Sequence, residues 1–133
     1  MTLPDWLSDL RSPLDEKLGT TITELTPERV IGHLPVDGNQ QVFGLLHGGA
    51  NGVLIETLAS MGAYAHAKEL GKVVVGVDLN VTHVRSVTSG NVTCVATAVK
   101  LGKQLAVYDA EIRDDEGQLT AKGRLTCQLV EKR

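Results

Sequence analysis

The residues of this 133-residue chain that could do chemistry gather in one stretch, residues 40–63. A polar loop ends in His47 and two glycines, and a segment of small and apolar residues follows, with one carboxylate, Glu56, in its middle. The free N–H groups at the start of a helix can polarise a carbonyl or stabilise an oxyanion. A carboxylate among apolar residues suits the work of a base or a nucleophile. The stretch predicts a catalytic site. The structural alternative is a Glu56 that pairs with His66 or Arg85, or one that points to solvent at a subunit edge.

Helical spacing places four of these residues on one face, because Gly48, Gly52, Glu56 and Ser60 are each four positions apart. Gly48 and Glu56 are nevertheless about 12 Å apart along a helix axis that rises about 1.5 Å per residue. They could act on the same atom only if Glu56 reached back or if the two groups came from different subunits.

Other kinds of site have no support in the sequence. His47, His66 and His83 lack the ligand spacing and the Cys partner of a zinc site, so no metal is predicted. There is no Gly-x-Ser-x-Gly elbow, no Walker motif and no dinucleotide fingerprint. His47 also has a plainer interpretation as a hydrogen-bond partner of the backbone, and Asn51 as an ordinary first-turn residue.

Composition limits the remaining possibilities. With a net charge of −3 and scattered basic residues, the chain is predicted to bind neither nucleic acid nor an anionic membrane. Its first residues do not read as a signal peptide and no segment approaches the ~18 apolar residues of a membrane span, so a cytoplasmic location is predicted. Cys94 and Cys127 fall in strand-like runs and are predicted to be buried, reduced thiols.

The elements that must position the site are a helix beginning near Gly48 and about six strands, which together predict an α+β domain over residues 1–133. The strands are expected at residues 18–25, 29–36, 73–85, 91–100, 103–113 and 118–130. A helix that is apolar all round must be covered all round, which favours a curved antiparallel six-stranded sheet wrapped about it.

The strand at 73–85 carries two specific expectations. Its odd-numbered apolar residues from Val73 to Val81 are predicted to share one face, with a bulge or bend near Thr82 and Arg85 where the alternation breaks. The short connection to 91–100 predicts a hairpin between these two strands.

Residues 1–17 are predicted to be helical, with Ser12 as the N-cap before Pro13. Their apolar residues lie at helical spacing, namely Trp6, Leu7, Leu10 and Leu14. Such stripes usually face a core, so an element packed on the domain surface is favoured over a flap above a pocket.

The motif Gln41-x-Phe43-Gly44-x-x-His47-Gly48-Gly49-Ala50, followed by Glu56-x-Leu58-Ala59-Ser60, resembles the hotdog-fold acyl-CoA thioesterases. Within these it is similar to the branch of the phenylacetate-degradation and Arthrobacter-type 4-hydroxybenzoyl-CoA thioesterases. The resemblance extends from about residue 18 to residue 130 and implies the hotdog fold for the whole domain.

The resemblance also implies a mechanism, the hydrolysis of an aromatic or medium-chain acyl-CoA, in which coenzyme A is part of the substrate and no cofactor is needed. The N–H of Gly48 would polarise the thioester carbonyl, and Glu56 of the neighbouring subunit would act as nucleophile or general base. Gln41 and His47 would orient the carbonyl, the water or the thiolate, and Ser60 would position the water or the carboxylate. The residues implied in substrate binding are Asn80, His83, Arg85, Ser89 and Gly90 at the coenzyme A, and Phe43, Met61, Tyr64 and Trp6 at the acyl group.

The resemblance also corrects the hairpin expected between 73–85 and 91–100. It implies instead that strand 73–85 is an edge strand that pairs with its copy, within a homotetramer that is a dimer of hotdog dimers. An apolar edge left open invites such association. Val42 stands where this branch commonly has Pro, so the loop before His47 is expected to be less rigid. Two alternatives stay open: an enoyl-thioester hydratase, which needs a His facing an Asp or Glu, and a non-catalytic acyl-CoA-binding hotdog module.

Overall fold

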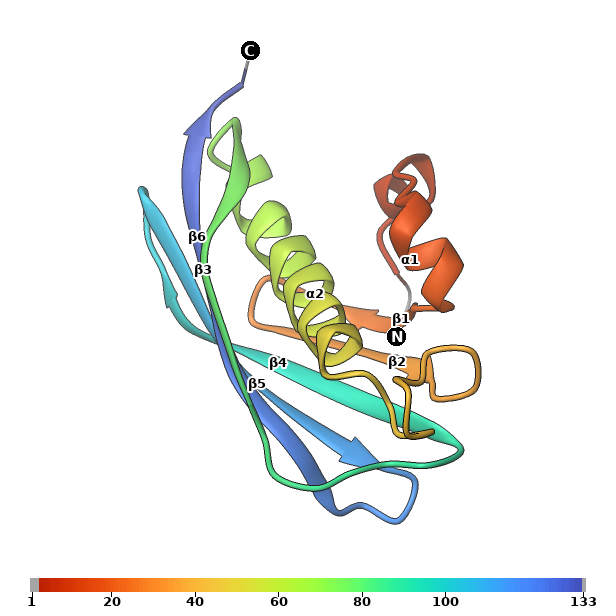
Figure 1. Ribbon diagram of the computed structural model, residues 1–133. Coiled ribbons are helices and arrows are strands. Elements are labelled where there is room, and N and C mark those ends of the chain that lie inside the picture. The colour runs from red at the N-terminus through yellow and green to blue at the C-terminus, as the bar shows by residue number, and fades with distance from the viewer. Residues whose placement is uncertain (1–2, 133) are drawn as a thin grey trace.

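The computed structural model describes residues 3–132 and shows a six-stranded antiparallel sheet curved around one long helix (Figure 1), so the predicted α+β hotdog fold is confirmed. The elements in chain order are η1 (Asp5–Asp9), α1 (Pro13–Leu18), β1 (Thr21–Leu25), β2 (Arg29–Pro35), α2 (Gly48–Lys68), β3 (Lys72–His83), β4 (Asn91–Leu101), β5 (Leu105–Asp114) and β6 (Leu119–Glu131). No helix within the described residues is both long and apolar enough to cross a membrane.

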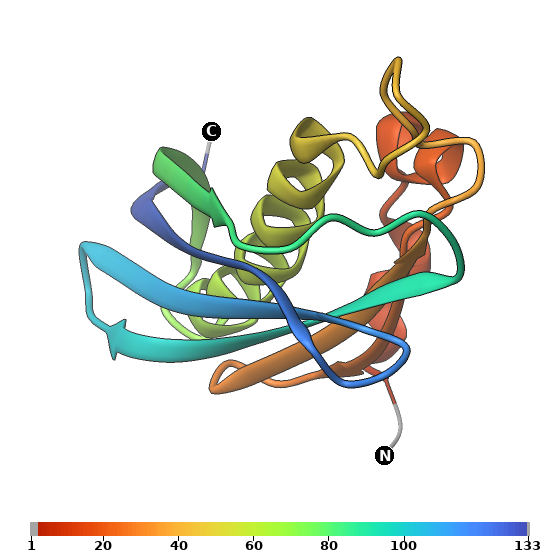
Figure 2. The same ribbon diagram turned by 60° about the horizontal axis from the view of Figure 1, so that its bottom comes forward.

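The strand order is β1-β2-β4-β5-β6-β3, so β3 forms one edge of the sheet. Among the described strands β3 pairs only with β6, and the hairpin predicted between 73–85 and 91–100 is wrong. The connection from β3 does not turn back tightly but runs across the end of the sheet to reach β4 (Figure 2). The edge position implied by the resemblance is confirmed.

The irregularity in β3 lies in a different place from the one predicted. The register against β6 shifts between Gly76 and Asp78. At this bulge the alternation of side chains between the two faces of the sheet is interrupted. Val74 before it and Val81 after it both pack against the core, so the predicted single face from Val73 to Val81 is wrong. The bend expected after residue 82 is present, because the N–H groups of residues 84 and 85 both donate to the Thr120 carbonyl, at 2.8 and 3.2 Å.

One face of α2 packs directly on the sheet. Its residues Leu54, Ile55 and Leu58 are fully buried. Gly62 brings the helix close, since a Cβ atom there would lie 2.8 Å from the Tyr108 hydroxyl, which itself donates to the Pro27 carbonyl. The tight contact fixes the helix across the concave side of the sheet (Figure 1).

The opposite face of α2 is not covered by the sheet, so the expectation of cover all round is wrong. Val53, Thr57, Ser60 and Met61 are only half-buried there, and Glu56 is exposed. The N-terminal segment of η1 and α1 lies on this side of α2 (Figure 1). The apolar residues of this face are thus left for another partner.

The N-terminal segment begins α1 as the sequence predicts. The Asp15 N–H donates to the Ser12 side chain at 3.3 Å, and Pro13 occupies the first turn, so the predicted N-cap is confirmed. Gly19 ends the helix with a φ of 82°, a left-handed conformation that suits glycine. These caps define a short rigid element beside α2.

Both cysteines are free and buried, as predicted. Burial raises the pKa of the Cys94 thiol to about 12. Burial also raises the pKa of Cys127, although a hydrogen bond with Ser60 opposes this. Neither thiol is therefore a thiolate near neutral pH, and neither is a candidate nucleophile.

Candidate active site

The start of α2 presents a hydrogen-bond donor that has no partner within residues 3–132. The Gly49 N–H donates to Nδ1 of His47 at 2.8 Å, and the Ala50 N–H donates to the His47 carbonyl at 3.0 Å. The N–H of Gly48 has no acceptor among residues 3–132. The plainer interpretation of His47 as a backbone partner is confirmed, and it leaves Gly48 as the free donor of this first turn.

The same cap fixes the tautomer of His47. Because Nδ1 accepts a hydrogen bond, the neutral ring carries its proton on Nε2. His47 is exposed, so this N–H can meet a ligand. The helix start therefore offers two donors, one from the backbone and one from the imidazole.

Gln41 supplies a third donor through a similar constraint. Its Oε1 accepts from the N–H groups of Phe43 and Leu45, at 2.6 and 3.1 Å. These bonds orient the amide, so its Nε2 group is a donor, and it has no acceptor among the described residues. The loop of residues 40–46 also closes on itself through Gln41 N–H to the Leu45 carbonyl at 2.8 Å and projects from the body (Figure 2).

His83 lies against the helix start and is held by Asn51, so the interpretation of Asn51 as an ordinary first-turn residue is wrong. A Cβ on Gly48 would lie 2.7 Å from Nε2 of His83. Nδ1 of the same ring is 3.2 Å from Nδ2 of Asn51, which is only 5% exposed and whose Oδ1 has no partner. Asn51 thus orients His83, and its signal in the sequence was an amide within an otherwise apolar helical segment.

Glu56 is exposed, and no ion pair or hydrogen bond joins it to another of the described residues. Its Oε2 lies 2.7 Å from the position that a Cβ on Gly76 would take, so the absent side chain makes room for the carboxylate beside the bulge of β3. His66 instead bonds the Gly102 carbonyl at 2.7 Å. The ion pair with His66 or Arg85 is therefore wrong, whereas the exposure of Glu56 beside the edge strand fits the other structural alternative, a carboxylate that points to solvent.

The predicted common face of α2 runs along the edge strand. Its contacts with β3 are, in order, Gly48 with His83, Gly52 with Leu79 and Val81, and Glu56 with Gly76. Ser60 continues the face and lies near the Cys127 thiol of β6, where it opposes the rise in the pKa of that thiol. The start of α2, where the free donors lie, and the Glu56 carboxylate are therefore both beside the open edge of the sheet.

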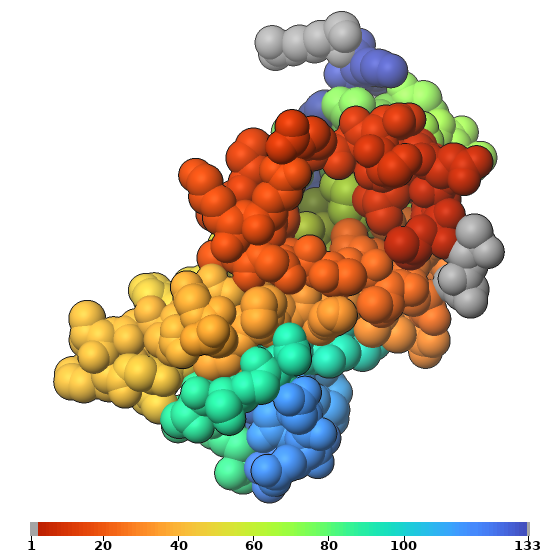
Figure 3. All heavy atoms as spheres, turned by 90° about the vertical axis from the view of Figure 1, so that its right-hand side faces the viewer, coloured from red at the N-terminus to blue at the C-terminus, as the bar shows by residue number. Residues whose placement is uncertain are grey.

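A cavity of about 560 Å³ lies between the open face of α2 and the N-terminal segment. Figure 3 shows it as a hollow between two parts of that segment, with α2 at its floor. Glu56, Ser60 and Met61 line it, whereas Gln41, His47 and Gly48 do not. The N-terminal segment lines the cavity as well, which fits the flap interpretation. Its Trp6 and Leu7 also pack against the core, as the favoured packing interpretation predicts.

The other residues implied in substrate binding lie outside this cavity. Asn80 is on β3, and Arg85, Ser89 and Gly90 are on the connection to β4, all exposed. Phe43 is 82% exposed at the tip of the 40–46 loop. Within residues 3–132 no three His, Cys, Asp or Glu side chains are grouped so that they could share a metal ion.

Sequence comparisons place the chain among known proteins. The profile of a family described as Thioesterase superfamily matches residues 43–121. A curated relative from Deinococcus radiodurans with a provisional esterase name is 41% identical over 121 residues, 91% of this chain and 76% of the relative. The proofreading thioesterase EntH of Cronobacter sakazakii is 36% identical over 116 residues, 86% of this chain and 84% of EntH.

Solved structures share the fold over nearly the whole chain. A mutant of thioesterase PA1618 from Pseudomonas aeruginosa superposes with a TM-score of 0.89 at 34% identity, covering 97% of this chain and 96% of that one. Thioesterase HI1161 from Haemophilus influenzae gives a TM-score of 0.83 at 37% identity, covering 89% and 82%.

Proposed function

Because this chain belongs to the thioesterase superfamily and is a thioester hydrolase, we propose that it hydrolyses an aromatic or medium-chain acyl-CoA to the free acid and coenzyme A, in the manner of the phenylacetate-degradation and 4-hydroxybenzoyl-CoA branch. The observation that carries the proposal is the Glu56 carboxylate, which has no partner among the described residues and lines the cavity. An unpaired carboxylate at the wall of an apolar cavity is placed for acid–base or nucleophilic work.

The donors at the start of α2 suit a thioester carbonyl. The free N–H of Gly48 would hydrogen-bond the carbonyl oxygen and stabilise the negative charge that develops on it. Nε2 of Gln41 and Nε2 of His47 would orient the carbonyl or the departing thiolate, since both are free to donate. Removal of one such donor typically lowers kcat by about 10²–10³-fold in hydrolases.

Glu56 would drive the attack in one of two ways. As a general base it takes a proton from water, whose oxygen then attacks the carbonyl carbon, and the collapse of the tetrahedral intermediate breaks the C–S bond. As a nucleophile its carboxylate attacks first, and water hydrolyses the resulting anhydride. In both routes the thiolate of coenzyme A leaves and takes up a proton, and Ser60 would orient the water or the carboxylate.

The separation of the two clusters supports a site shared between subunits. The cavity that holds Glu56 lacks the three donors, and the helix axis places Gly48 about 12 Å away. Along β3, Gly76 lies beside Glu56 and His83 beside Gly48. An antiparallel pairing of β3 with its copy reverses this order, so it would bring the donor end of one copy toward Glu56 of the other.

The edge of β3 has the character that such pairing requires. Val75 and Val77 are 49% and 60% exposed, and the strand is 12 residues long. A long apolar edge without a partner is prone to associate. We therefore include in the proposal a dimer with a continuous sheet, and the homotetramer built from two such dimers.

Coenzyme A would lie along the same edge. Arg85 is exposed beyond the end of β3 and can pair with a phosphate of the nucleotide, with Asn80, His83, Ser89 and Gly90 nearby in the sequence. The acyl group would extend from the carbonyl into the cavity past Met61. Phe43, exposed on its projecting loop, would reach the acyl group of a neighbouring copy.

A thiol-release assay tests the proposal. Purified protein is expected to release free thiol from benzoyl-, hydroxyphenylacetyl- or medium-chain acyl-CoA, and Glu56→Gln is expected to lower kcat by about 10²–10⁴-fold. Glu56 is exposed, so folding and oligomeric state should not change. Glu69→Gln, at the exposed end of the same helix, serves as the control. Unchanged activity in Glu56→Gln would overturn the mechanism.

A further inference from the structure

The N-terminal segment, residues 3–18, touches α2 at two points and leaves the cavity between them; we call this segment the roof. At one point the Trp6 ring packs edge-on against Tyr64, with 5.2 Å between centroids. Nζ of Lys68 lies 5.4 Å from the centre of one ring and 5.2 Å from the other. At this end the roof is therefore held to the last turns of the helix.

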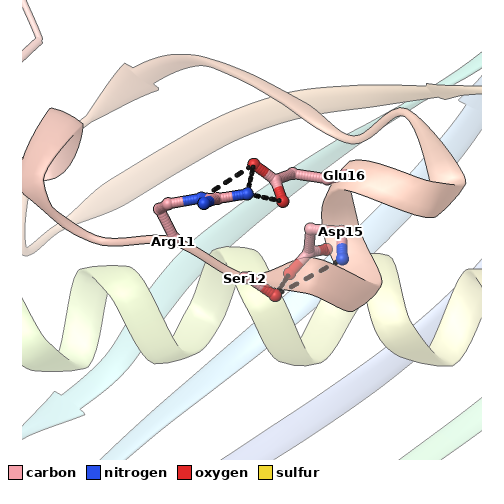
Figure 4. Close-up of polar contacts among 4 residues, drawn as sticks. All are labelled: Arg11, Ser12, Asp15 and Glu16. Atoms are coloured by element: carbon pink, nitrogen blue, oxygen red, sulfur yellow. Dashed lines mark hydrogen bonds and ion pairs between the residues drawn. The ribbon is translucent and has the colours of Figure 1, made fainter.

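At the second point a carboxylate ties α1 to α2. The Thr57 hydroxyl lies 2.9 Å from each carboxylate oxygen of Asp15, to which it donates. Ser12 also donates to Asp15, at 2.6 Å (Figure 4), so the acceptor is held in place by the cap of α1. Among the described residues this is the only side-chain hydrogen bond between α1 and α2, and it lies one residue from Glu56.

The apolar side chains that line the cavity include no aromatic ring. Leu7, Leu10 and Leu14 come from the roof, and Ile22, Val53 and Met61 face them from β1 and α2. Leu10 and Leu14 are 46% and 52% exposed, so the core of the domain does not use them. Apolar side chains left exposed around a concave surface of this size are typical of a ligand site.

Several polar groups of the cavity pair with one another, whereas the buried Thr20 hydroxyl has no partner among the described residues. Arg11 and Glu16 form an ion pair at 2.9 Å (Figure 4) and leave no unpaired charge there. Glu56 and Ser60 belong to the reacting end of the proposed site. If Glu56 attacks a thioester in this cavity, the coenzyme A part of the substrate would point away from the leucines of the roof, which close the other side. It would point toward the start of an α2 helix, where the free donors lie.

We infer that the roof is the acyl-selecting wall of this enzyme, that it covers an aliphatic acyl chain lying on α2, and that the Asp15–Thr57 contact positions it. The inference rests on the proposed function and narrows its substrate class to aliphatic acyl groups. A flexible chain fills an aliphatic trough better than a flat ring, and each methylene buried there strengthens binding about fourfold.

A chain-length series tests the wall. For the wild type, kcat/KM is expected to rise by up to about fourfold per methylene from acetyl- to decanoyl-CoA and to exceed the value for benzoyl-CoA. Leu10→Ala should lower the ratio of decanoyl- to acetyl-CoA hydrolysis severalfold. Leu70→Ala, a similarly exposed leucine outside the cavity at 42% against 46%, should leave the ratio unchanged. An unchanged ratio in Leu10→Ala would overturn the inference.

The tie between Asp15 and Thr57 is tested by removing one hydroxyl. Thr57→Val keeps the shape of the side chain but cannot donate, and it should raise KM for decanoyl-CoA severalfold with little change in kcat. Thr57→Ser restores the donor and should restore KM. A uniform fall in kcat for all chain lengths would show a merely structural role and would contradict positioning by this contact.

A binding measurement separates the inference from the proposed function. Trp6 is the single tryptophan of the chain and lies in the roof, so its fluorescence reports on this segment. Decanoate should change the emission in a saturable way, benzoate should not, and Leu10→Ala should weaken the response. Decanoate binding without acyl-CoA hydrolysis would refute only the proposed function. Hydrolysis without a saturable change in fluorescence would refute only the inference that the roof binds the acyl chain.

Discussion

The two faces of α2 are built for different purposes. The face on the sheet buries Leu54, Ile55 and Leu58 completely, while the face below the roof leaves Val53 half-buried and Glu56 exposed. One side of this apolar helix is therefore part of the buried core, and the other side forms the wall of the proposed ligand site. Glu56 avoids the cost of burying a charge because it lies on the side that the sheet does not cover.

The largest effect is expected on the sheet face. Leu58→Ala should lower the free energy of unfolding by about 2–5 kcal/mol, because it leaves a cavity against Gly32 and its neighbours. Val53→Ala, on the open face of the same helix, should cost clearly less. Chemical denaturation measures both, and equal losses would contradict the division between the faces.

The next effect concerns the carboxylate rather than the core. Gly76→Ala would place a Cβ atom 2.7 Å from Oε2 of Glu56, and the flexible end of that side chain would move aside. We expect kcat/KM to fall by up to about 100-fold, since displacing a reacting group by about 1 Å can cost that much. The denaturation midpoint should change little. A large loss of stability with normal activity would show that Gly76 serves the fold instead.

The exclusion of water from the sheet side of α2 can be measured through the pH dependence of protein stability. Burial raises the pKa of Cys94 to about 12 from 9.0, so the folded state keeps a proton that the unfolded state loses. The contribution of this thiol to the free energy of unfolding is fully present below pH 9. It falls by about 1.4 kcal/mol per pH unit as the pH rises toward the pKa of the folded state.

Denaturation of the wild type and of Cys94→Ala between about pH 9 and pH 11 measures this contribution, and the variant should show the smaller slope. Groups other than Cys94 titrate equally in both proteins and cancel in the difference. Identical slopes would mean that the environment of Cys94 is wetter than the structure indicates.

The smallest effect is expected at the rim of the open face. Arg11 and Glu16 are 77% and 53% exposed, and exposed ion pairs of this kind contribute about 0–1 kcal/mol. Arg11→Ala should therefore leave both the unfolding free energy and kcat/KM nearly unchanged. A marked loss of activity would show that the Arg11–Glu16 ion pair contacts the substrate, which the account does not expect.

The sequence predicted the six strands because their apolar periods are long and regular, as in β6, where small and apolar residues alternate with polar ones. It predicted the helix from a long run of small and apolar residues after Gly48. It could not predict that β3 pairs with β6, since that choice depends on packing between distant segments. The bulge at Gly76 was missed because a glycine between valines continues the alternation without showing where the register shifts.

The candidate site was predictable in its residues but not in its arrangement. His47, Gly48 and Glu56 stood out through residue type and spacing, whereas the link of Asn51 to His83 requires the close approach of helix and strand. The roof was predicted only in part, because leucines have the same spacing whether they face a core, as Leu7 does, or only a cavity, as Leu10 and Leu14 do. Only the structure shows that the helix beneath them is uncovered.

The central claim is that Glu56 serves the donors of another chain, and mixing two defective proteins tests it most directly. Glu56→Gln and the double variant Gln41→Ala/His47→Ala should each be nearly inactive alone. After dissociation and reassociation together, a mixed dimer contains one intact site of its two, so activity should return to about one quarter of the wild type. If activity did not return although mixed dimers had formed, Glu56 would act within its own chain and the account would be wrong.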